Sequence, residues 1–297
     1  MTAPNAICPI CSSQIVSPYY RRNREFPVKS FTPSVSDFGI FYNLHRCDGC
    51  HTVFASEMPS AQELANVYQS SHPDGYLLEK KNRQRNFQRL IKTLAKYVDH
   101  NKQVKLLDVG ASIGLFLETV HVIFPHWELL GVEASSTATE MAARRYGIKL
   151  IQGMFETIDL LPDNQDIITM LDLIEHVRSP LEVICQANRL LKSGGILVIS
   201  TPNIESWTSR LFRSHWWGFR CMHTLYFSPL SMKQMLAKGG FRVITMRGLI
   251  RLFTLRYCLR HLGWPIQGPS ISIPFPLSLG DMLVIARKES SVFPQTV

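Results

Sequence analysis

The 297-residue sequence has no long hydrophobic run: none approaches the roughly 20 apolar residues of a membrane-spanning helix. Its first residues, MTAPNAICPI, lack the charged start and apolar core of a secretion signal. These absences argue against a membrane-spanning or secreted protein, so we expect a cytoplasmic location. In that compartment the seven cysteines are not expected to form structural disulfides.

Acidic residues are scarce toward the C-terminus. Residues 200–297 contain 3 acidic and 12 basic side chains, and the net charge of the whole chain is +9. Such a bias indicates an anionic partner, which would be a phosphorylated small molecule, a lipid surface or RNA. A basic face that merely keeps the protein soluble explains the bias equally well.

Four cysteines form two C-x-x-C pairs, Cys8 with Cys11 and Cys47 with Cys50. Four thiolates in two close pairs match a tetrahedral zinc site. Because four protein ligands leave no open position, we expect a structural rather than a catalytic metal. The alternatives are a redox pair or two chance pairs. We therefore interpret residues 1–58 as a small N-terminal zinc-ribbon module with four cysteine ligands.

Residues 104–133 form the central motif of the chain. An apolar run ends at the turn Gly110-Ala111-Ser112-Ile113-Gly114, an amphipathic segment follows, and a second apolar run ends at Glu133. This is the pattern of a strand, a glycine turn, a helix and a strand. A carboxylate at the end of the second strand is suited to bind the two hydroxyls of a ribose.

Two cofactor classes use such a motif. Dinucleotide enzymes have G-x-G-x-x-G, with a pyrophosphate at the helix N-terminus. Here there are two glycines, and Asp108 stands two positions before the first. A carboxylate there would repel a pyrophosphate and attract an ammonium group. The turn can also be structural, with no ligand.

Strands and helices alternate through the rest of the chain, which predicts an α/β fold with a mostly parallel sheet. We expect a helical linker or lid at residues 59–100 and the main domain at residues 101–297. Paired glycines, Gly194-Gly195 and Gly239-Gly240, are expected to end two helices. An insertion at about 249–280 interrupts the domain.

Several segments together resemble the class I S-adenosylmethionine-dependent methyltransferases: LLDVGASIG, GVEAS, LDLIEHV, LLKSGGILVISTPN and a helix-GGF-strand segment. The LDLIEHV segment is similar to the quinone-biosynthesis O-methyltransferase branch. The resemblance implies a Rossmann-like sheet whose final strand is antiparallel. Ser112 departs from the family pattern, where glycine is common, and fits only if the position needs no positive φ.

The resemblance also implies residue roles for the cofactor S-adenosyl-L-methionine. Glu133 would bind the ribose, and Tyr76 would close over the cofactor. Asp108, Gly110, Ala111 and Gly114 would line the methionine part. Ala134, Met154 and Phe155 would lie by the adenine. Leu171 and Asp172 would lie beneath the sulfonium.

Two sets of residues are candidates for the acceptor side. Asp172, Glu175 and His176 would hold a divalent metal, as in some quinone O-methyltransferases, or would only pack the loop. His223 would act as a base or an orienting group for a hydroxyl, in a segment whose aromatic residues suggest an acceptor wall. Arginines at 210, 213 and 220 would hold an anionic group, and those at 251, 256 and 260 would face a membrane surface.

We therefore expect a methyltransferase for a small-molecule hydroxyl, on a sugar, a lipid-linked compound or an aromatic compound. One alternative is an RNA methyltransferase that uses the zinc module and the basic face. The chain has no N-P-P-Y-type tetrapeptide, which argues against base methylation. The other alternative is a zinc-dependent binding protein with a vestigial methyltransferase domain.

Overall fold

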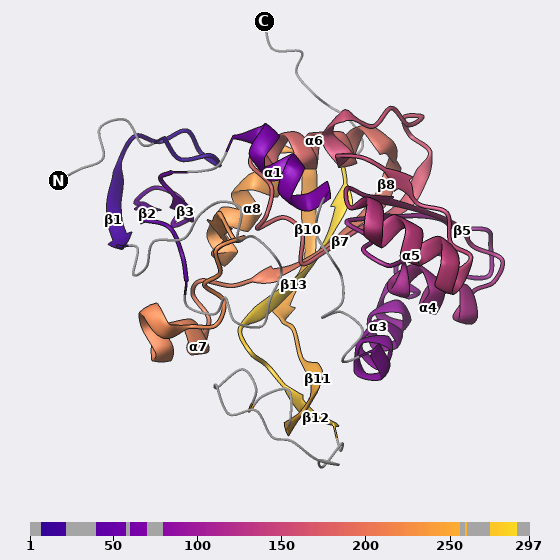
Figure 1. Ribbon diagram of the computed structural model, residues 1–297. Helices are drawn as coiled ribbons and strands as arrows, with labels where there is room; N and C mark the ends of the chain where they lie inside the picture. The colour runs from indigo at the N-terminus through magenta and orange to yellow at the C-terminus, as the bar shows by residue number, and fades with distance from the viewer. Residues whose placement is uncertain are drawn as a thin grey trace, which may run out of the picture.

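The computed structural model describes residues 7–21, 40–57, 60–69, 80–255, 259 and 274–289 (Figure 1). Its main body is a seven-stranded sheet with the spatial order β10-β13-β8-β7-β4-β5-β6. The strands are β4 (Lys105–Val109), β5 (Glu128–Glu133), β6 (Ile151–Gln152), β7 (Gln165–Leu171), β8 (Leu191–Pro202), β10 (Phe241–Gly248) and β13 (Asp281–Lys288). The strands from β6 to β8 pair in parallel, whereas β13 is antiparallel to β8 and β10. The predicted fold class is confirmed.

Side chains on successive residues of the central strands enter different cores. In β4, Leu107 and Val109 belong to one buried cluster and Leu106 to another. The same alternation continues in β7, β8 and β13, as the two-residue period of a strand requires. Helices α6 and α8 cover the first face, and α3 and α4 cover the second, with α5 beside α4. Their bounds are α3 (Lys80–Leu94), α4 (Leu115–Ile123), α5 (Ser136–Tyr146), α6 (Pro180–Leu190) and α8 (Pro229–Lys238).

Local signals place several helix ends. The side chain of Ser60 caps α1 (Ala61–Gln69) together with Glu63, and Ser135 caps α5. Gly147 ends α5 in the left-handed conformation, with φ 66°. The prediction that Gly194-Gly195 would end a helix was wrong. Here α6 ends at Leu190 and β8 follows at once, with the two glycines inside an irregularity of its pairing with β7.

The N-terminal segment shares a sheet with the main domain (Figure 1). Its strands β1 (Val16–Tyr20), β2 (Leu44–Cys47) and β3 (Val53–Ala55) continue into β9 (Leu225–Tyr226). Phe41 and Leu44 share a buried cluster with Trp216, Phe219 and Tyr226. The described residues of the predicted zinc module are therefore packed into the domain, while the boundary at residue 58 stays a prediction.

The insertion contributes an antiparallel hairpin, β11 (Arg251–Thr254) and β12 (Pro274–Leu277), which projects below the sheet in Figure 1. The side chain of Asn86, on α3, forms two hydrogen bonds with the backbone of Leu252: Nδ2 donates to the carbonyl at 3.2 Å, and Oδ1 accepts from the N–H at 2.7 Å. The amide side chain thus makes the pair of hydrogen bonds that a neighbouring strand would make. Arg256 and Arg260 lie outside the described residues.

Shorter elements complete the fold. They are the helix α7 (Trp207–Phe212) and the 3-10 turns η2 (Phe155–Thr157) and η3 (Arg213–His215). No helix within the ranges given above is long and apolar enough to cross a membrane.

Gly131 of β5 provides a test of the packing between the sheet and α4. A Cβ there would lie 2.5 Å from Leu150 Cδ2 and 2.7 Å from Leu117 Cδ1. Overpacking of this kind costs about 1–3 kcal/mol, so Gly131→Ala should lower the free energy of unfolding by that amount in urea titrations. Gly248→Ala is the control, because among the described residues its Cβ would meet only Ser278 Oγ, at 3.6 Å. Equal stability of the two variants would contradict the packing.

Candidate functional site

The turn after β4 has three residues in the left-handed conformation. Gly110 has φ 74°, and Gly114, the residue before α4, has φ 75°. Ser112 has φ 50°, so the condition set above for a serine at this position, no positive φ, is not met, and serine itself adopts the left-handed conformation. The Ser112 N–H donates to Glu133 Oε2 at 2.7 Å, which holds the strained residue in place. Left-handed backbone costs a non-glycine residue about 1–2 kcal/mol, and strain of this kind is common at functional sites.

Glu133 lies at the end of β5 and is half-buried. Its Oε2 accepts the Ser112 N–H, and its Oε1 accepts the Ser135 N–H at 2.8 Å. Burial raises the pKa of Glu133, and the backbone N–H groups oppose that shift. Each carboxylate oxygen can accept a further hydrogen bond. The carboxylate, held in place by the two N–H groups, is therefore suited to accept hydrogen bonds from two ribose hydroxyls.

Asp108 lies inside β4, where its side chain is buried and its Oδ1 accepts a 2.6 Å hydrogen bond from Thr169 Oγ1. Burial raises its pKa to about 7. A buried carboxylate is costly without a counter-charge, so this position favours a ligand that carries a cation, such as an ammonium group.

The loop after β6 lies beside Glu133, because the Gly153 N–H donates to the Glu133 carbonyl at 2.9 Å. Phe155 on this loop is buried, and Met154 and Ala134 are half-buried. Ala111 is buried in the turn after β4. Tyr76 lies outside the described residues.

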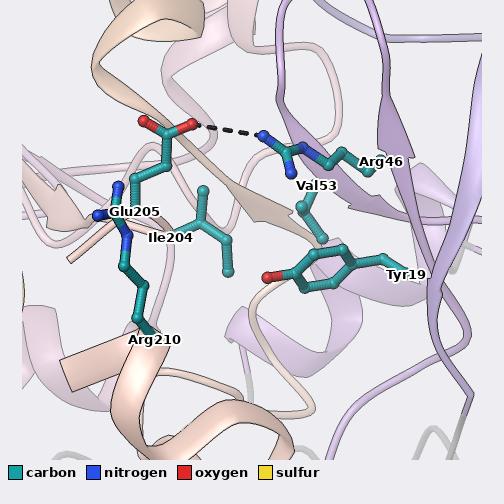
Figure 2. Close-up of a pocket in the computed structure, with 6 residues that line it drawn as sticks. All are labelled: Tyr19, Arg46, Val53, Ile204, Glu205 and Arg210. Carbon is teal, nitrogen blue, oxygen red and sulfur yellow. Dashed lines mark ion pairs between the residues drawn. The ribbon is translucent and has the colours of Figure 1, made fainter. Parts of the chain in front are cut away.

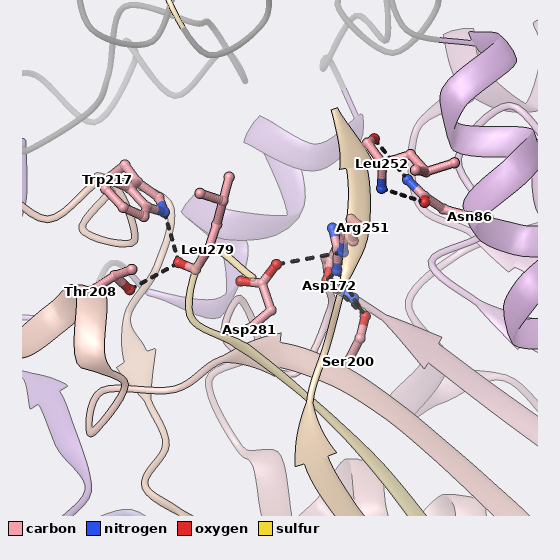
Figure 3. A network of polar contacts seen from close by, with 9 residues as sticks. All are labelled: Asn86, Asp172, Ser200, Thr208, Trp217, Arg251, Leu252, Leu279 and Asp281. Carbon is pink, nitrogen blue, oxygen red and sulfur yellow. Dashed lines mark hydrogen bonds and ion pairs between the residues drawn. The ribbon is translucent and has the colours of Figure 1, made fainter. Parts of the chain in front are cut away.

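Asp172 follows Leu171 at the end of β7 with φ 56°, another left-handed residue that is not glycine. Its carboxylate is bound by Arg251 of the β11–β12 hairpin, with Nη1–Oδ2 2.8 Å and Nη2–Oδ1 2.6 Å (Figure 3). Ser200 Oγ also donates to Oδ1, at 2.7 Å. Burial alone would raise the pKa of Asp172, but Arg251 and Ser200 hold it below its usual value.

Sequence reasoning gave Arg251 no role beside Asp172: it placed the residue in the insertion and considered it for a membrane surface. Its Nε also lies 3.5 Å from Asp281 Oδ2, so one guanidinium contacts two carboxylates. The candidate metal set of Asp172, Glu175 and His176 does not converge as a group of ligating atoms in the described part of the chain. The Asp172 carboxylate faces Arg251, and the group of ligating atoms contains His223 in its place.

Glu175, His176 and His223 converge: one ligating atom of each lies within 4.8 Å of the other two. His176 Nδ1 contacts the Met222 carbonyl at 3.1 Å, and His223 Nδ1 contacts the Gly218 carbonyl at 2.8 Å. Burial lowers the pKa of His176 to about 4 and that of His223 well below its usual value. Burial and the charge of Asp172 raise the pKa of Glu175.

The aromatic residues near His223 are not an open acceptor wall. Trp216, Phe219 and Tyr226 are fully buried in the cluster shared with the N-terminal segment. A small pocket of about 150 Å³ lies nearby, between that segment and α7. Figure 2 shows its lining of Tyr19, Arg46, Val53, Ile204, Glu205 and Arg210, with Arg46 3.5 Å from Glu205.

The four cysteines of the two C-x-x-C pairs come together against α8. Their sulfurs all lie within 4.8 Å of one another, with Cys8 3.5 Å from Cys50 and Cys11 3.4 Å from Cys47. The N–H groups of Ile10 and Cys50 point to the sulfurs of Cys8 and Cys47. A tetrahedral zinc site with bonds of about 2.3 Å has sulfurs about 3.8 Å apart, so the cluster fits zinc.

Comparison with known proteins gives three kinds of match. A family model described as a methyltransferase domain matches residues 80–246, more than half of the chain. A ubiquinone biosynthesis O-methyltransferase from Cereibacter sphaeroides is 23% identical over 159 residues, which cover 50% of this chain and 64% of that protein. The chain therefore aligns with less than two thirds of that relative.

Solved structures share the fold. A Thermotoga maritima S-adenosylmethionine-dependent methyltransferase, described as a possible histamine N-methyltransferase, has a TM-score of 0.52 and 18% identity, covering 73% of this chain and 94% of its own. A chain from the Haloferax volcanii complex of the Trm112 methyltransferase activator with a putative methyltransferase has a TM-score of 0.56 and 12% identity, covering 79% and 100%. With the matched family model, these results show that the chain belongs to the methyltransferase-domain family and has the class I S-adenosylmethionine-dependent methyltransferase fold.

Proposed function

We propose that the protein transfers a methyl group from S-adenosylmethionine to a hydroxyl of a small molecule. The observation that carries the proposal is the pair of carboxylates, Asp108 and Glu133, on adjacent parallel strands around a left-handed glycine turn. Asp108 is suited to an ammonium group, and Glu133 is suited to the hydroxyls of a ribose. The name of the ubiquinone biosynthesis relative supports a hydroxyl acceptor.

The cofactor would lie along the carboxyl ends of β4, β5 and β7. Asp108, Gly110, Ala111 and Gly114 would hold the methionine part, and Glu133 would hold the ribose. Ala134, Met154 and Phe155 would flank the adenine, and Leu171 and Asp172 would lie by the sulfonium. The ionised Asp172 offers negative charge there, partly balanced by Arg251.

The bound cofactor supplies an electrophilic methyl group, so the protein must align the acceptor and exclude water. The acceptor side is formed by Asp172, His176 and His223. We assign an orienting role to His223, because its Nδ1 is fixed by the Gly218 carbonyl and no hydrogen bond found within the described part of the chain uses Nε2. The arginines at 210, 213 and 220 would favour an acceptor with a phosphate or carboxylate group.

We also propose a structural zinc at Cys8, Cys11, Cys47 and Cys50. Three of these cysteines belong to the buried cluster that also contains Met232 and Met235 of α8. The Lys238 Nζ donates to the Ile10 carbonyl at 2.8 Å. Zinc would therefore hold the N-terminal sheet against the domain, on the side where β9 and His223 lie.

Metal analysis should find one zinc in this cluster. Cys47→Ser should lower its zinc content and increase hydrogen exchange in β1–β3, because the small sheet depends on its metal. The exposed Cys185 gives the matched control, Cys185→Ser, which should keep both properties. Freshly purified native protein without zinc would refute the assignment.

The cofactor site is tested at Glu133. Glu133→Ala removes hydrogen bonds to a charged group and should weaken S-adenosylmethionine binding by about 1.5–3 kcal/mol, measured by calorimetry. Glu140→Ala, on the surface of α5 beside Arg144, should leave the affinity unchanged. Unaltered affinity in a folded Glu133→Ala protein would place the cofactor elsewhere.

The acceptor side is tested at His223. Misplacement of an acceptor by about 1 Å costs of the order of 100-fold in rate, so His223→Asn should lower turnover by at least that factor. Cofactor affinity should stay the same, because the cofactor contacts lie on other strands. His121→Asn, at an exposed histidine, is the control. Full turnover in His223→Asn would make this histidine purely structural.

A further inference from the structure

The small pocket of about 150 Å³ between the N-terminal sheet and α7 is polar and has walls from two distant parts of the chain (Figure 2). Each strand of the N-terminal sheet supplies one lining residue, and the segment that follows β8 supplies the rest. In chain order the lining residues are Tyr19, Arg46, Val53, Ile204, Glu205 and Arg210. The proposed function assigns a role to Arg210 alone among them, so a ligand site here goes beyond it.

The two apolar residues of the pocket are held by one stretch of chain. Val53 pairs with Tyr226 of β9, and the Ile204 N–H donates to the carbonyl of Phe227, the next residue, at 3.0 Å. Val53 and Ile204 are both buried. The wall from the N-terminal sheet and the wall from the main domain are therefore fixed relative to each other before a ligand binds, which lowers the entropic cost of binding.

The polar residues offer donors that the protein itself does not fully use. Glu205 Oε1 lies 3.5 Å from Arg46 Nη2 and 3.5 Å from His51 Nδ1. Charge-assisted hydrogen bonds are shorter, about 2.7–2.9 Å, so neither contact is tight. Arg210 is exposed on α7, and no hydrogen bond or ion pair of its side chain is found among the described residues. With two guanidinium groups and one carboxylate, the lining favours an anion.

An irregularity in β1 lies at Tyr19. Pro18 and Tyr20 pair with neighbouring residues of β2, which leaves Tyr19 as the extra residue of a β-bulge. Bulges re-aim side chains and are frequent beside functional sites. In Figure 2 the Tyr19 hydroxyl points toward Ile204. Burial raises the pKa of Tyr19 to about 12, so its hydroxyl keeps the proton and can donate a hydrogen bond to a ligand.

We propose that this pocket binds a small phosphate monoester that carries hydroxyl groups, such as a phosphorylated polyol. Arg46 and Arg210 bind the phosphate, because guanidinium groups match its geometry and its charge of nearly −2 at neutral pH. Tyr19 donates a further hydrogen bond. Glu205 repels a second anionic group, and its Oε2 accepts a hydrogen bond from a ligand hydroxyl.

The size of the pocket limits the ligand. A cavity of about 150 Å³ holds a molecule such as benzene. A phosphate with a short hydroxylated chain therefore fits, with part of it exposed beside Arg210. Because the ligand contacts both walls, the N-terminal sheet would take part in recognition as well as in holding the proposed zinc.

The test is calorimetric titration of the full chain, at one ionic strength, with three probes: glycerol 3-phosphate, inorganic phosphate and the diester glycerophosphoglycerol. We expect glycerol 3-phosphate to bind at one site. Inorganic phosphate should bind more weakly, because it has no alcohol for Glu205. The diester carries a single charge and should bind at least about tenfold more weakly than the monoester.

Variants locate the site. Arg46→Gln and Arg210→Gln should each weaken binding of glycerol 3-phosphate by at least about tenfold, because each removes hydrogen bonds between charged groups. Glu205→Ala should affect the two phosphates in opposite ways. It should tighten binding of inorganic phosphate and abolish the preference for glycerol 3-phosphate. Arg242→Gln is the matched control, since it removes an exposed arginine of β10 whose Nε lies 4.0 Å from Glu289.

Three results would overturn the proposal. The wild type could show no saturable binding of glycerol 3-phosphate, or the diester could bind as tightly as the monoester, as a lipid headgroup or nucleic acid would. Arg242→Gln and Arg210→Gln could also lose binding equally, which would mean non-specific attraction to a basic surface. Arg210 is exposed, so its variant should fold even where Arg46→Gln, next to Cys47, does not. S-adenosylmethionine titrated into the same protein tests the methyltransferase proposal separately.

Discussion

The parallel pairing of β4 with β5 and β7 is the constraint on which the site depends. Asp108 pairs with Gly131 and Val109 with Val132, while Val109 also lies beside Met170. The carboxyl ends of the three strands therefore meet at one edge, where the glycine turn, Glu133 and Asp172 follow. Leu117 and Leu150 fill the space where a side chain on Gly131 would lie. A shift in the pairing of β5 with β4 would bring a residue with a side chain into that space, so the packing favours the observed register.

Buried charge is the second feature that these strands impose. Asp108 has no cationic side chain among its interactions in the described part of the chain, and its pKa is raised by burial. Asp172 and Asp281 share Arg251. Arg251 thus neutralises part of the negative charge of the two acids near the proposed acceptor. The positive charge that would pair with Asp108 would have to come from a bound ligand. Ser112 and Asp172 add backbone strain at the same edge, which the hydrogen bonds of Glu133 and Ser200 maintain.

Local patterns in the sequence predicted much of this. The strand, glycine turn and helix around Gly110 and the two cysteine pairs each depend on residues that are close together in the sequence. The antiparallel final strand came from the resemblance. Contacts between distant segments could not be predicted in this way. Nothing near Val53 indicates its pairing with Tyr226, and an arginine at 251 does not reveal that a hairpin brings it to Asp172. The φ of Ser112 likewise depends on Glu133, 21 residues away.

The claim that this edge holds S-adenosylmethionine is tested most directly by calorimetric titration of the wild-type protein with that cofactor and, separately, with NADH. The Asp108 carboxylate would pair with the ammonium group of the first and repel the pyrophosphate of the second. One equivalent of S-adenosylmethionine should therefore bind, with NADH at least about tenfold weaker, a difference of about 1.4 kcal/mol or more. Tighter binding of NADH would contradict the assignment and make the glycine turn a dinucleotide site.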